Sequence, residues 1–123
     1  MFRVIIAGSR NFSDFAFLQK KMDFLLQNVI DQVEILCGEA RGADALGKKY
    51  ALQKGYSCAS FPADWKKYGR AAGPMRNRDM AKNADACVCF WDGKSKGTEN
   101  MIDEARKAGL CLRVYLDGKR MFS

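Results

Sequence analysis

Short apolar runs alternate along the chain with longer segments in which apolar residues recur at helical spacing. The apolar runs predict β-strands at residues 2–7, 33–37, 57–61, 85–91 and 110–116. The helical spacing predicts helices over residues 15–29, 43–54, 74–83 and 98–108. This alternation is typical of a parallel sheet with helices on both faces. Because crossovers are right-handed, few arrangements remain, and we expect strand order 3-2-1-4-5 in one three-layer α/β domain over residues 1–123.

Turn and capping residues mark the ends of these predicted helices. Ser13 or Asp14 can cap the first helix, and Gly55 is expected to end the second. Pro74 suits the first position of the third helix, where its missing N–H costs nothing. Thr98 is the expected cap of the fourth helix. The core-facing residues of this last helix are expected to be Met101, Ile102, Ala105 and Ala108.

The length and composition fit one globular domain. A chain of 123 residues, 48% of them apolar, buries roughly two thirds of the surface that it exposes when unfolded. The apolar run from Val4 is interrupted at Gly8, which is too short for a signal peptide or a membrane span. We therefore expect a soluble cytoplasmic protein with no membrane partner.

The cysteines predict reduced, buried thiols. Each of the five lies in an apolar, strand-like run, and the odd number argues against a disulfide framework. They are Cys37, Cys58, Cys87, Cys89 and Cys111. Cys87 and Cys89 alternate onto one strand face, but the chain has no histidine and no second cysteine pair at ligand spacing. We expect no metal site.

The net charge of +7 favours anionic partners without identifying them. A solvated surface accounts for most of the lysines, including Lys20, Lys21, Lys48, Lys49, Lys66, Lys67, Lys94 and Lys96. The arginines that follow glycine-rich strand ends are more informative.

Two polar, basic loops flank the point where the winding of the predicted sheet reverses. In an open parallel sheet, ligands bind there, outside the carboxyl ends of the strands. The loops read Gly-Ser-Arg-Asn at 8–11 and Asp-Gly-Lys-Ser-Lys-Gly-Thr at 92–98. Glycine permits close backbone approach, a helix start offers free N–H groups, and Arg10 adds a planar fork suited to phosphate. Ser9 and Thr98 add hydroxyl groups. Each loop alone is also consistent with a turn and a helix cap.

A third loop, at 38–44, repeats this pattern after the second strand and opens a helix. It reads Gly-Glu-Ala-Arg-Gly-Ala-Asp. Arg41 is a candidate clamp for a second phosphate. Asp44 either accepts a hydrogen bond from a ribose hydroxyl or simply favours the helix N-terminus by its charge.

The segment between the third strand and the third helix carries aromatic and basic residues together. Trp65 and Tyr68 are candidates to stack on a base, the alternative for Trp65 being a lid packed into the core. Arg76 and Asn77 fall in the first turn of the predicted third helix and either point at the same crevice or lie on the surface.

Several familiar catalytic and nucleotide motifs are missing. The Gly-Lys-Ser at 93–95 resembles the end of a P-loop, but Val88 stands where its first glycine belongs. No G-x-G-x-x-G fingerprint follows the first strand, so the sequence favours neither an ordinary NTPase nor an ordinary dehydrogenase. Because the chain has no histidine, a catalytic Ser-His-Asp triad or Cys-His dyad is excluded.

Five motifs in order resemble the YspA/YpsA-related SLOG family. They are GSR-x-F at 8–12, G-x-ARGAD at 38–44, PADW-x-x-YG-x-AG at 62–73, RN-x-x-M at 76–80 and WDG-x-S-x-GT at 91–98. The resemblance implies a Rossmann-like fold, related to that of the LOG phosphoribohydrolases and DprA-type DNA-binding proteins. It also implies that 38–44 and 93–98 are phosphate-contacting loops for a nucleotide or a derivative such as ADP-ribose or NAD.

The same resemblance argues against hydrolysis of the LOG type. LOG enzymes pair an arginine, which Arg76 matches, with an acid just after a Gly-Thr pair. The matching positions here hold Asn100 and Met101, and Glu99 comes one residue early. Cleavage of an N-glycosidic bond normally needs a carboxylate to stabilise the oxocarbenium-like centre. Asp92, Asp64 and Asp44 are the candidate substitutes, and the sequence selects none of them.

We therefore expect a domain that binds a nucleotide-type ligand as a sensor or by sequestering it, with no cofactor. A nucleotide N-glycosidase or hydrolase, with Arg76 as its catalytic candidate, is the first alternative. Single-stranded nucleic-acid binding is the second and is disfavoured. Related folds often dimerise, so completion of the site by a second subunit is a further alternative. The expected ligand-binding residues are Gly8, Ser9, Arg10, Gly38, Ala40, Arg41, Gly42, Asp44, Asp64, Trp65, Arg76, Asn77, Asp92, Gly93, Ser95, Gly97 and Thr98.

Overall fold

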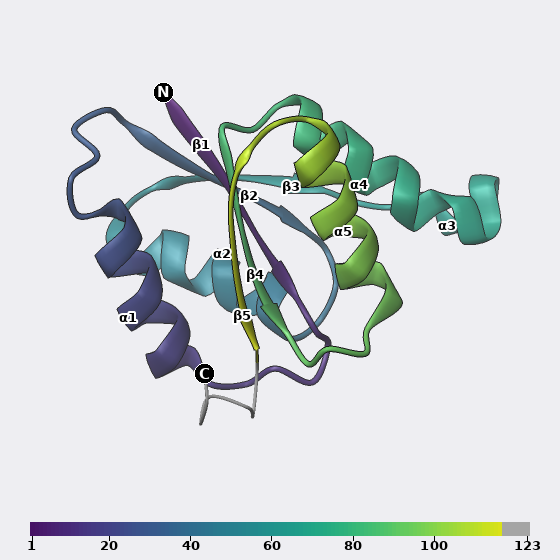
Figure 1. Cartoon of the computed structure of the whole chain (residues 1–123), viewed down its shortest axis with the longest axis horizontal. Coiled ribbons are helices and arrows are strands. Elements are labelled where there is room, and N and C mark those ends of the chain that lie inside the picture. The colour runs from purple at the N-terminus through teal and green to yellow at the C-terminus, as the bar shows by residue number, and fades with distance from the viewer. Residues whose placement is uncertain (117–123) are drawn as a thin grey trace.

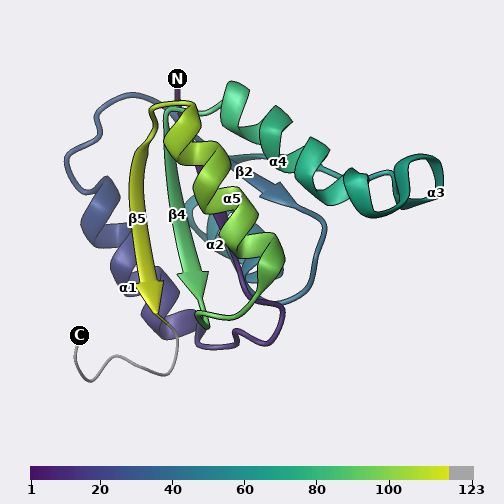
Figure 2. The same ribbon diagram turned by 45° about the vertical axis from the view of Figure 1, so that its right-hand side comes forward.

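The computed structural model describes residues 1–116 and contains a five-stranded parallel sheet with helices on both faces (Figures 1 and 2). The strands are β1 (Phe2–Gly8), β2 (Val33–Gly38), β3 (Ser57–Phe61), β4 (Ala86–Trp91) and β5 (Cys111–Leu116). The helices are α1 (Phe15–Leu26), α2 (Ala43–Lys54), α3 (Trp65–Tyr68), the 3₁₀ turn η1 (Gly69–Ala71), α4 (Ala72–Lys82) and α5 (Lys96–Lys107). The strand order β3-β2-β1-β4-β5 confirms the order expected from the sequence.

The central strand β1 marks the point where the winding of the sheet reverses. It pairs with β2 on one side and with β4 on the other, so Ile5 lies opposite Leu36 and also opposite Cys87. The chain runs outward from β1 to β3, then crosses to β4 and continues to β5. The loops after β1 and β4 therefore lie side by side at the carboxyl edge, where ligands bind in sheets of this type.

Two separate apolar layers hold the helices to the sheet. Side chains alternate across a strand, so Val4 and Ile6 of β1 face α1 and α2, whereas Ile5 and Ala7 face α4 and α5. Figure 2 shows α5 lying across β4 on one face of the sheet and α1 on the other. The core residues of the helices are Leu18 and Met22 in α1, Tyr50 and Ala51 in α2, Met80 and Ala81 in α4, and Met101, Ile102 and Ala105 in α5.

Two of the expected helix-end signals are confirmed. The Asp14 carboxylate caps α1 by accepting from Phe17 N–H at 3.0 Å. Gly55 ends α2 at φ +74°, a left-handed conformation that glycine adopts without strain. The expected first helix was too long, because α1 ends at Leu26 and Val29 packs on the core from the segment beyond it.

Other details of the helices also differ from the prediction. The segment 62–73 is not a plain loop, because it forms α3 and η1, and α4 begins at Ala72. Pro74 is thus the third residue of α4, where backbone N–H groups still have no helical partner. Ser95, not Thr98, caps α5, so Thr98 lies buried in its first turn. Ala108 is exposed at the end of α5 and does not face the core.

All five cysteines lie on strands as free thiols. Cys111 is exposed, contrary to the expected burial, because β5 is an edge strand. Cys87 and Cys89 share a face, with their Sγ atoms 3.7 Å apart. Residues 1–116 hold no group of three or more potential metal ligands. In the same part of the chain, no helix combines the length and the apolar character needed to cross a bilayer.

Candidate functional site

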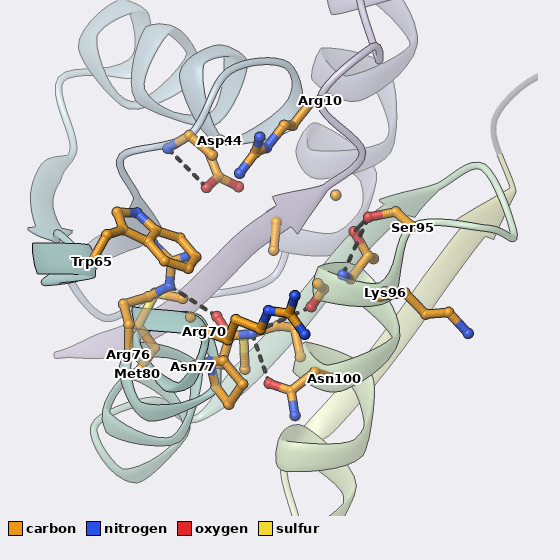
Figure 3. A pocket seen from close by; sticks show the side chains of 18 residues that line it. Arg10, Asp44, Trp65, Arg70, Arg76, Asn77, Met80, Ser95, Lys96 and Asn100 are labelled. Atoms are coloured by element: carbon orange, nitrogen blue, oxygen red, sulfur yellow. Dashed lines mark hydrogen bonds between the residues drawn. The ribbon is translucent and has the colours of Figure 1, made fainter. Parts of the chain in front are cut away.

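A hollow of about 330 Å³ opens at the carboxyl edge of the sheet (Figure 3). Its walls come from the end of β1 and the loop after it, the loop after β2, the start of α2, α3, η1, α4 and the start of α5. The residues that line it are Ala7, Gly8, Arg10, Ala40, Asp44, Trp65, Arg70, Gly73, Pro74, Arg76, Asn77, Met80, Ser95, Lys96, Gly97, Thr98, Asn100 and Met101. We call this space the main hollow.

Positive charge dominates the main hollow. Among the described residues, three arginine side chains and one carboxylate line it. The arginines are Arg10, Arg70 and Arg76, and the carboxylate is Asp44. The N-terminus of α5 adds backbone N–H groups whose dipoles favour an anion. The arrangement suits a small ligand with at least one phosphate-type group.

Arg76 is held in place by backbone and side-chain contacts at the base of the hollow. Its Nη1 donates to the Phe61 carbonyl oxygen at 3.2 Å, and its Nε donates to Asn77 Oδ1 at 2.9 Å. Gly38 leaves the space for this guanidinium, since a Cβ atom at residue 38 would overlap it. The guanidinium carries five N–H donors, so others remain for a ligand.

Asp44 is a buried carboxylate in a cationic setting, with 6% of its surface exposed. It accepts one hydrogen bond, from Ala40 N–H to Oδ2 at 3.3 Å. Burial raises the pKa of Asp44 to about 6, partly opposed by the positive charge of Arg76, the Ala40 hydrogen bond and Arg10. Figure 3 shows the Arg10 guanidinium directed toward this carboxylate. Its charge state therefore changes near neutral pH.

The loop after β4 is ordered by Asp92. Its Oδ1 accepts from the N–H groups of Lys94 and Ser95, both at 2.8 Å, and these bonds lower its pKa. The Asp92 N–H in turn donates to Ser9 Oγ at 2.9 Å, which ties the loop after β1 to the loop after β4. Ser95 then caps α5, accepting from Thr98 N–H and from the Thr98 hydroxyl. These contacts fix the position of the N-terminal turn of α5 beside the main hollow.

A second hollow of about 370 Å³ adjoins the first. Arg10, Ala40, Trp65 and Arg76 line both spaces, and the second adds Glu39, Arg41, Pro62 and Ala63. Arg41 thus lies next to the main hollow and outside it. We expected Arg10, Arg41, Arg76 and the Gly97–Thr98 turn to converge on one space. All but Arg41 line the main hollow, and Arg41 lines only the second.

Trp65 forms a partly open wall between the two hollows. Its side chain is 51% exposed, so the packing into the core considered as an alternative is wrong. The edge of its ring lies over Gly73, where a Cβ atom would be 3.1 Å from Trp65 Cη2. Tyr68 is exposed and does not line either hollow. Of the two aromatic candidates, only Trp65 is therefore placed to cover a bound ligand.

The residues predicted for the site fall into two groups, those that line the main hollow and those that support the lining residues. Those that line the main hollow are Gly8, Arg10, Ala40, Asp44, Trp65, Arg76, Asn77, Ser95, Gly97 and Thr98. Those that line neither hollow are Ser9, Gly38, Gly42, Asp64, Asp92 and Gly93. Asp64 caps α3 through Lys67 N–H at 3.1 Å, and Gly42 turns at φ +74° against the Ser9 carbonyl oxygen. These residues support the lining residues without contacting either space.

Several lining residues escape the sequence patterns. Arg70 lines the hollow, although it holds no motif position that indicates a site. Lys96 also borders it, but its side chain is 92% exposed and points away from the hollow, as expected for a solvated lysine (Figure 3). Asn100 and Met101 occupy the wall at positions where LOG-type enzymes carry acids. Glu99 does not line the hollow, and its carboxylate lies 4.0 Å from Lys96 Nζ. Of the three candidate substitute acids, only Asp44 lies in the hollow.

The fold and the site define a Rossmann-like α/β protein with a cationic hollow where the winding of the sheet reverses. Residues 2–68 match the YspA, cpYpsA-related SLOG family, and the chain belongs to that family. It is also 34% identical over 116 residues to the Gene 61 protein of Mycobacterium phage D29, covering 89% of this chain and 93% of that protein.

Two solved structures share the fold. DNA processing protein A (DprA) from Streptococcus pneumoniae superposes with a TM-score of 0.68 at 18% identity, covering 92% of this chain and 49% of that one. The chain therefore spans about half the length of DprA. TM1055, a structural-genomics target, superposes with a TM-score of 0.66 at 19% identity, covering 91% of this chain and 72% of that one. At these identities the likeness extends to the fold alone.

Proposed function

We propose that this protein binds a phosphate-bearing nucleotide or nucleotide derivative in the main hollow, as a sensor or by sequestering the ligand. One observation carries the proposal: Arg10, Arg70 and Arg76 line the same space as the N-terminus of α5. Cations and helix N–H groups around a partly enclosed space favour a phosphate. Membership of the SLOG family supports a nucleotide-type ligand.

The surroundings of the cations favour an organic phosphate over a bare ion. Trp65 offers an aromatic face at the boundary of the main hollow, and Met80 and Met101 add apolar wall. A base or a sugar face can pack against these groups while the phosphate meets the arginines. The space of about 330 Å³ is within the range of small-molecule sites.

Thermal unfolding with added AMP, ADP-ribose and NAD tests the proposal directly. A ligand at one hundred times its dissociation constant adds about 2.7 kcal/mol of stability, which corresponds to several degrees in Tm. Calorimetry then gives Kd for the compounds that shift Tm. Absence of both a Tm shift and a binding signal at millimolar concentration would reject the proposal for these ligands.

A matched pair of variants separates the site from general electrostatics. Arg76→Gln is expected to weaken binding at least tenfold, because it removes a charged donor from the hollow. Arg106→Gln removes the same charge from the exposed last turn of α5, outside both hollows, and is expected to leave Kd within about twofold. Equal losses in the two variants would indicate nonspecific attraction by the net charge of +7.

Asp44 favours one further candidate, an N-glycosidic hydrolase. It is a buried carboxylate within the main hollow, and its pKa of about 6 leaves it largely ionised at pH 7. Such a group can stabilise positive charge at an anomeric carbon while water adds there and the base leaves with a proton. Chromatography after incubation with AMP or NAD detects the released base, and its absence at high enzyme concentration would remove this candidate for those compounds.

A further inference from the structure

Asp44 is out of place in a site that serves only to bind phosphate. Among residues 1–116, it is the one carboxylate lining the main hollow, and its buried negative charge opposes any anion placed beside it. A pocket built for phosphate alone would be better served by a neutral donor at this position. Since Asp44 weakens phosphate binding by itself, its presence calls for a second group on the ligand.

The hydrogen-bonding capacity of Asp44 is largely unused. A carboxylate accepts about four hydrogen bonds, and the structure records one, from Ala40 N–H to Oδ2 at 3.3 Å. The neighbouring Arg76 directs Nε and Nη1 to Asn77 and to the Phe61 carbonyl oxygen. Within the described part of the chain, Asp44 forms no ion pair within 4.0 Å. Its Oδ1 is therefore left to accept from a ligand in the hollow.

The surrounding charges restrict what that ligand group can be. Arg10 and Arg76 lie close enough to Asp44 to lower its pKa, so a cationic ligand group would be repelled by two guanidinium groups. A neutral O–H donor meets no such repulsion and forms a charge-assisted hydrogen bond with the carboxylate. A phosphate on the same ligand can meanwhile reach the cations, because they line the same hollow.

We infer that Asp44 is a specificity-determining residue that selects ligands carrying a hydroxyl donor beside an anionic group, as a ribose carries beside its phosphate. The inference rests on the proposed function and narrows it. The site is expected to prefer ribonucleotides over their deoxy counterparts and over inorganic phosphate. A free sugar phosphate presents the same chemistry, so the test includes ribose 5-phosphate.

Calorimetric titrations with AMP, 2′-deoxy-AMP, 3′-deoxy-AMP, ribose 5-phosphate and inorganic phosphate test this inference. For the wild type, removal of the recognised hydroxyl is expected to raise Kd by about 10- to 100-fold, the range for a hydrogen bond to a charged group. Asp44→Asn keeps the shape of the side chain and is expected to reduce this ratio to about threefold or less. Asp103→Asn, an exposed substitution on α5, is the matched control and should keep the wild-type ratio.

The outcomes separate the inference from the proposed function. If wild type binds AMP and both deoxy compounds equally, the inference fails while the proposed function stands. If Asp44→Asn keeps the full wild-type ratio, another residue reads the hydroxyl and the inference also fails. If none of these compounds, ADP-ribose or NAD binds at millimolar concentration, the proposed function itself is rejected. Ribose 5-phosphate binding with the same Asp44 dependence supports the inference and assigns recognition to the sugar phosphate.

Discussion

Asn77 Oδ1 accepts a hydrogen bond from Arg76 Nε at 2.9 Å, which fixes the direction of the arginine at the base of the main hollow. The Asn77 Nδ2 group donates to the Gly97 carbonyl oxygen at 3.3 Å and to Asn100 Oδ1 at 2.9 Å. A single buried amide therefore joins the arginine on α4 to the first turns of α5. The two elements that would meet a phosphate share one support.

Replacement of Asn77 by alanine is expected to lower stability and ligand affinity together. The change removes three hydrogen bonds from a residue that is 5% exposed and leaves Arg76 Nε without its acceptor. We expect a loss of about 1–3 kcal/mol in the free energy of unfolding. Urea unfolding measures the loss, with Asn28→Ala, an exposed change after α1, as control. A loss no larger than that of the control would show that the amide network adds nothing to stability.

Ser9→Ala should loosen the connection between the loops after β1 and β4. Ser9 is 1% exposed, and its Oγ accepts from Asp92 N–H at 2.9 Å. Without this acceptor, the amide of a half-buried residue loses its partner, at a cost of about 1–2 kcal/mol. Hydrogen exchange at Asp92 and Lys94 is expected to accelerate. Ser13→Ala, an exposed change near the start of α1, should leave both readouts unchanged. Unaltered exchange in Ser9→Ala would contradict the prediction.

The order of the elements and the place of the site follow from patterns that are local in the sequence. Apolar runs, helical spacing and glycine-ended strands predict the sheet, and the reversal between β1 and β4 then places the site. Asp44 follows a glycine-ended strand and opens a helix. Arg76 was expected in the first turn of a helix from Pro74, but α4 begins at Ala72, so Arg76 is its fifth residue. That both residues lie near the carboxyl edge of the sheet can be predicted from the sequence. The contacts that hold Arg76 against Gly38 and Phe61 cannot.

The parts that escape prediction depend on contacts between distant segments. Ser95 and Thr98 are both good capping residues, and the choice of Ser95 depends on where Asp92 anchors the loop. Arg70 is not a motif position, and it reaches the main hollow from η1, which leads into α4, the helix that packs against α5. Asp92 has the sequence context of a ligand-binding residue, although its carboxylate is occupied by the N–H groups of Lys94 and Ser95.

A methyl group is expected to act differently at two glycines of the site. At Gly38 a Cβ atom would overlap the Arg76 guanidinium, so Gly38→Ala should displace that side chain and weaken AMP binding about tenfold. Gly97 lies in the first turn of α5, and apart from its chain neighbours and the backbone of its own helix, no atom lies within 4 Å of the position that an added methyl group would take. Alanine there should raise stability by up to about 1 kcal/mol, because alanine favours helix over glycine.

The effect of Gly97→Ala on affinity locates the ligand. A phosphate that approaches the N-terminus of α5 would meet the added methyl group, so affinity should fall while Tm rises. Calorimetry and thermal unfolding of the same preparation measure the two quantities. An unchanged Kd in Gly97→Ala would place the phosphate away from α5, and an unchanged Kd in Gly38→Ala would show that Arg76 does not contact it.

The buried charge of Asp44 is expected to lower the stability of the fold. Burial raises its pKa from an ordinary value of 3.8 to about 6, so the folded state binds its proton more tightly than the unfolded state does. The stabilising contribution of the protonated form is complete below pH 3.8 and is lost as the pH rises through 6. At pH 7 the charged carboxylate costs the fold about 2–3 kcal/mol.

Asp44→Asn should therefore stabilise the unliganded protein in a pH-dependent manner. The difference in unfolding free energy between variant and wild type is expected to be small near pH 4, to grow between pH 4 and 6, and to level off at about 2–3 kcal/mol by pH 7. Taking this difference cancels the titration of the other carboxylates, and urea unfolding from pH 4 to 8 measures it. Asp103→Asn should show no such rise. A difference that stays constant with pH would mean that folding does not raise the pKa of Asp44. A rise, together with the loss of hydroxyl selectivity, would mean that the fold tolerates an unfavourable buried charge because the ligand requires it.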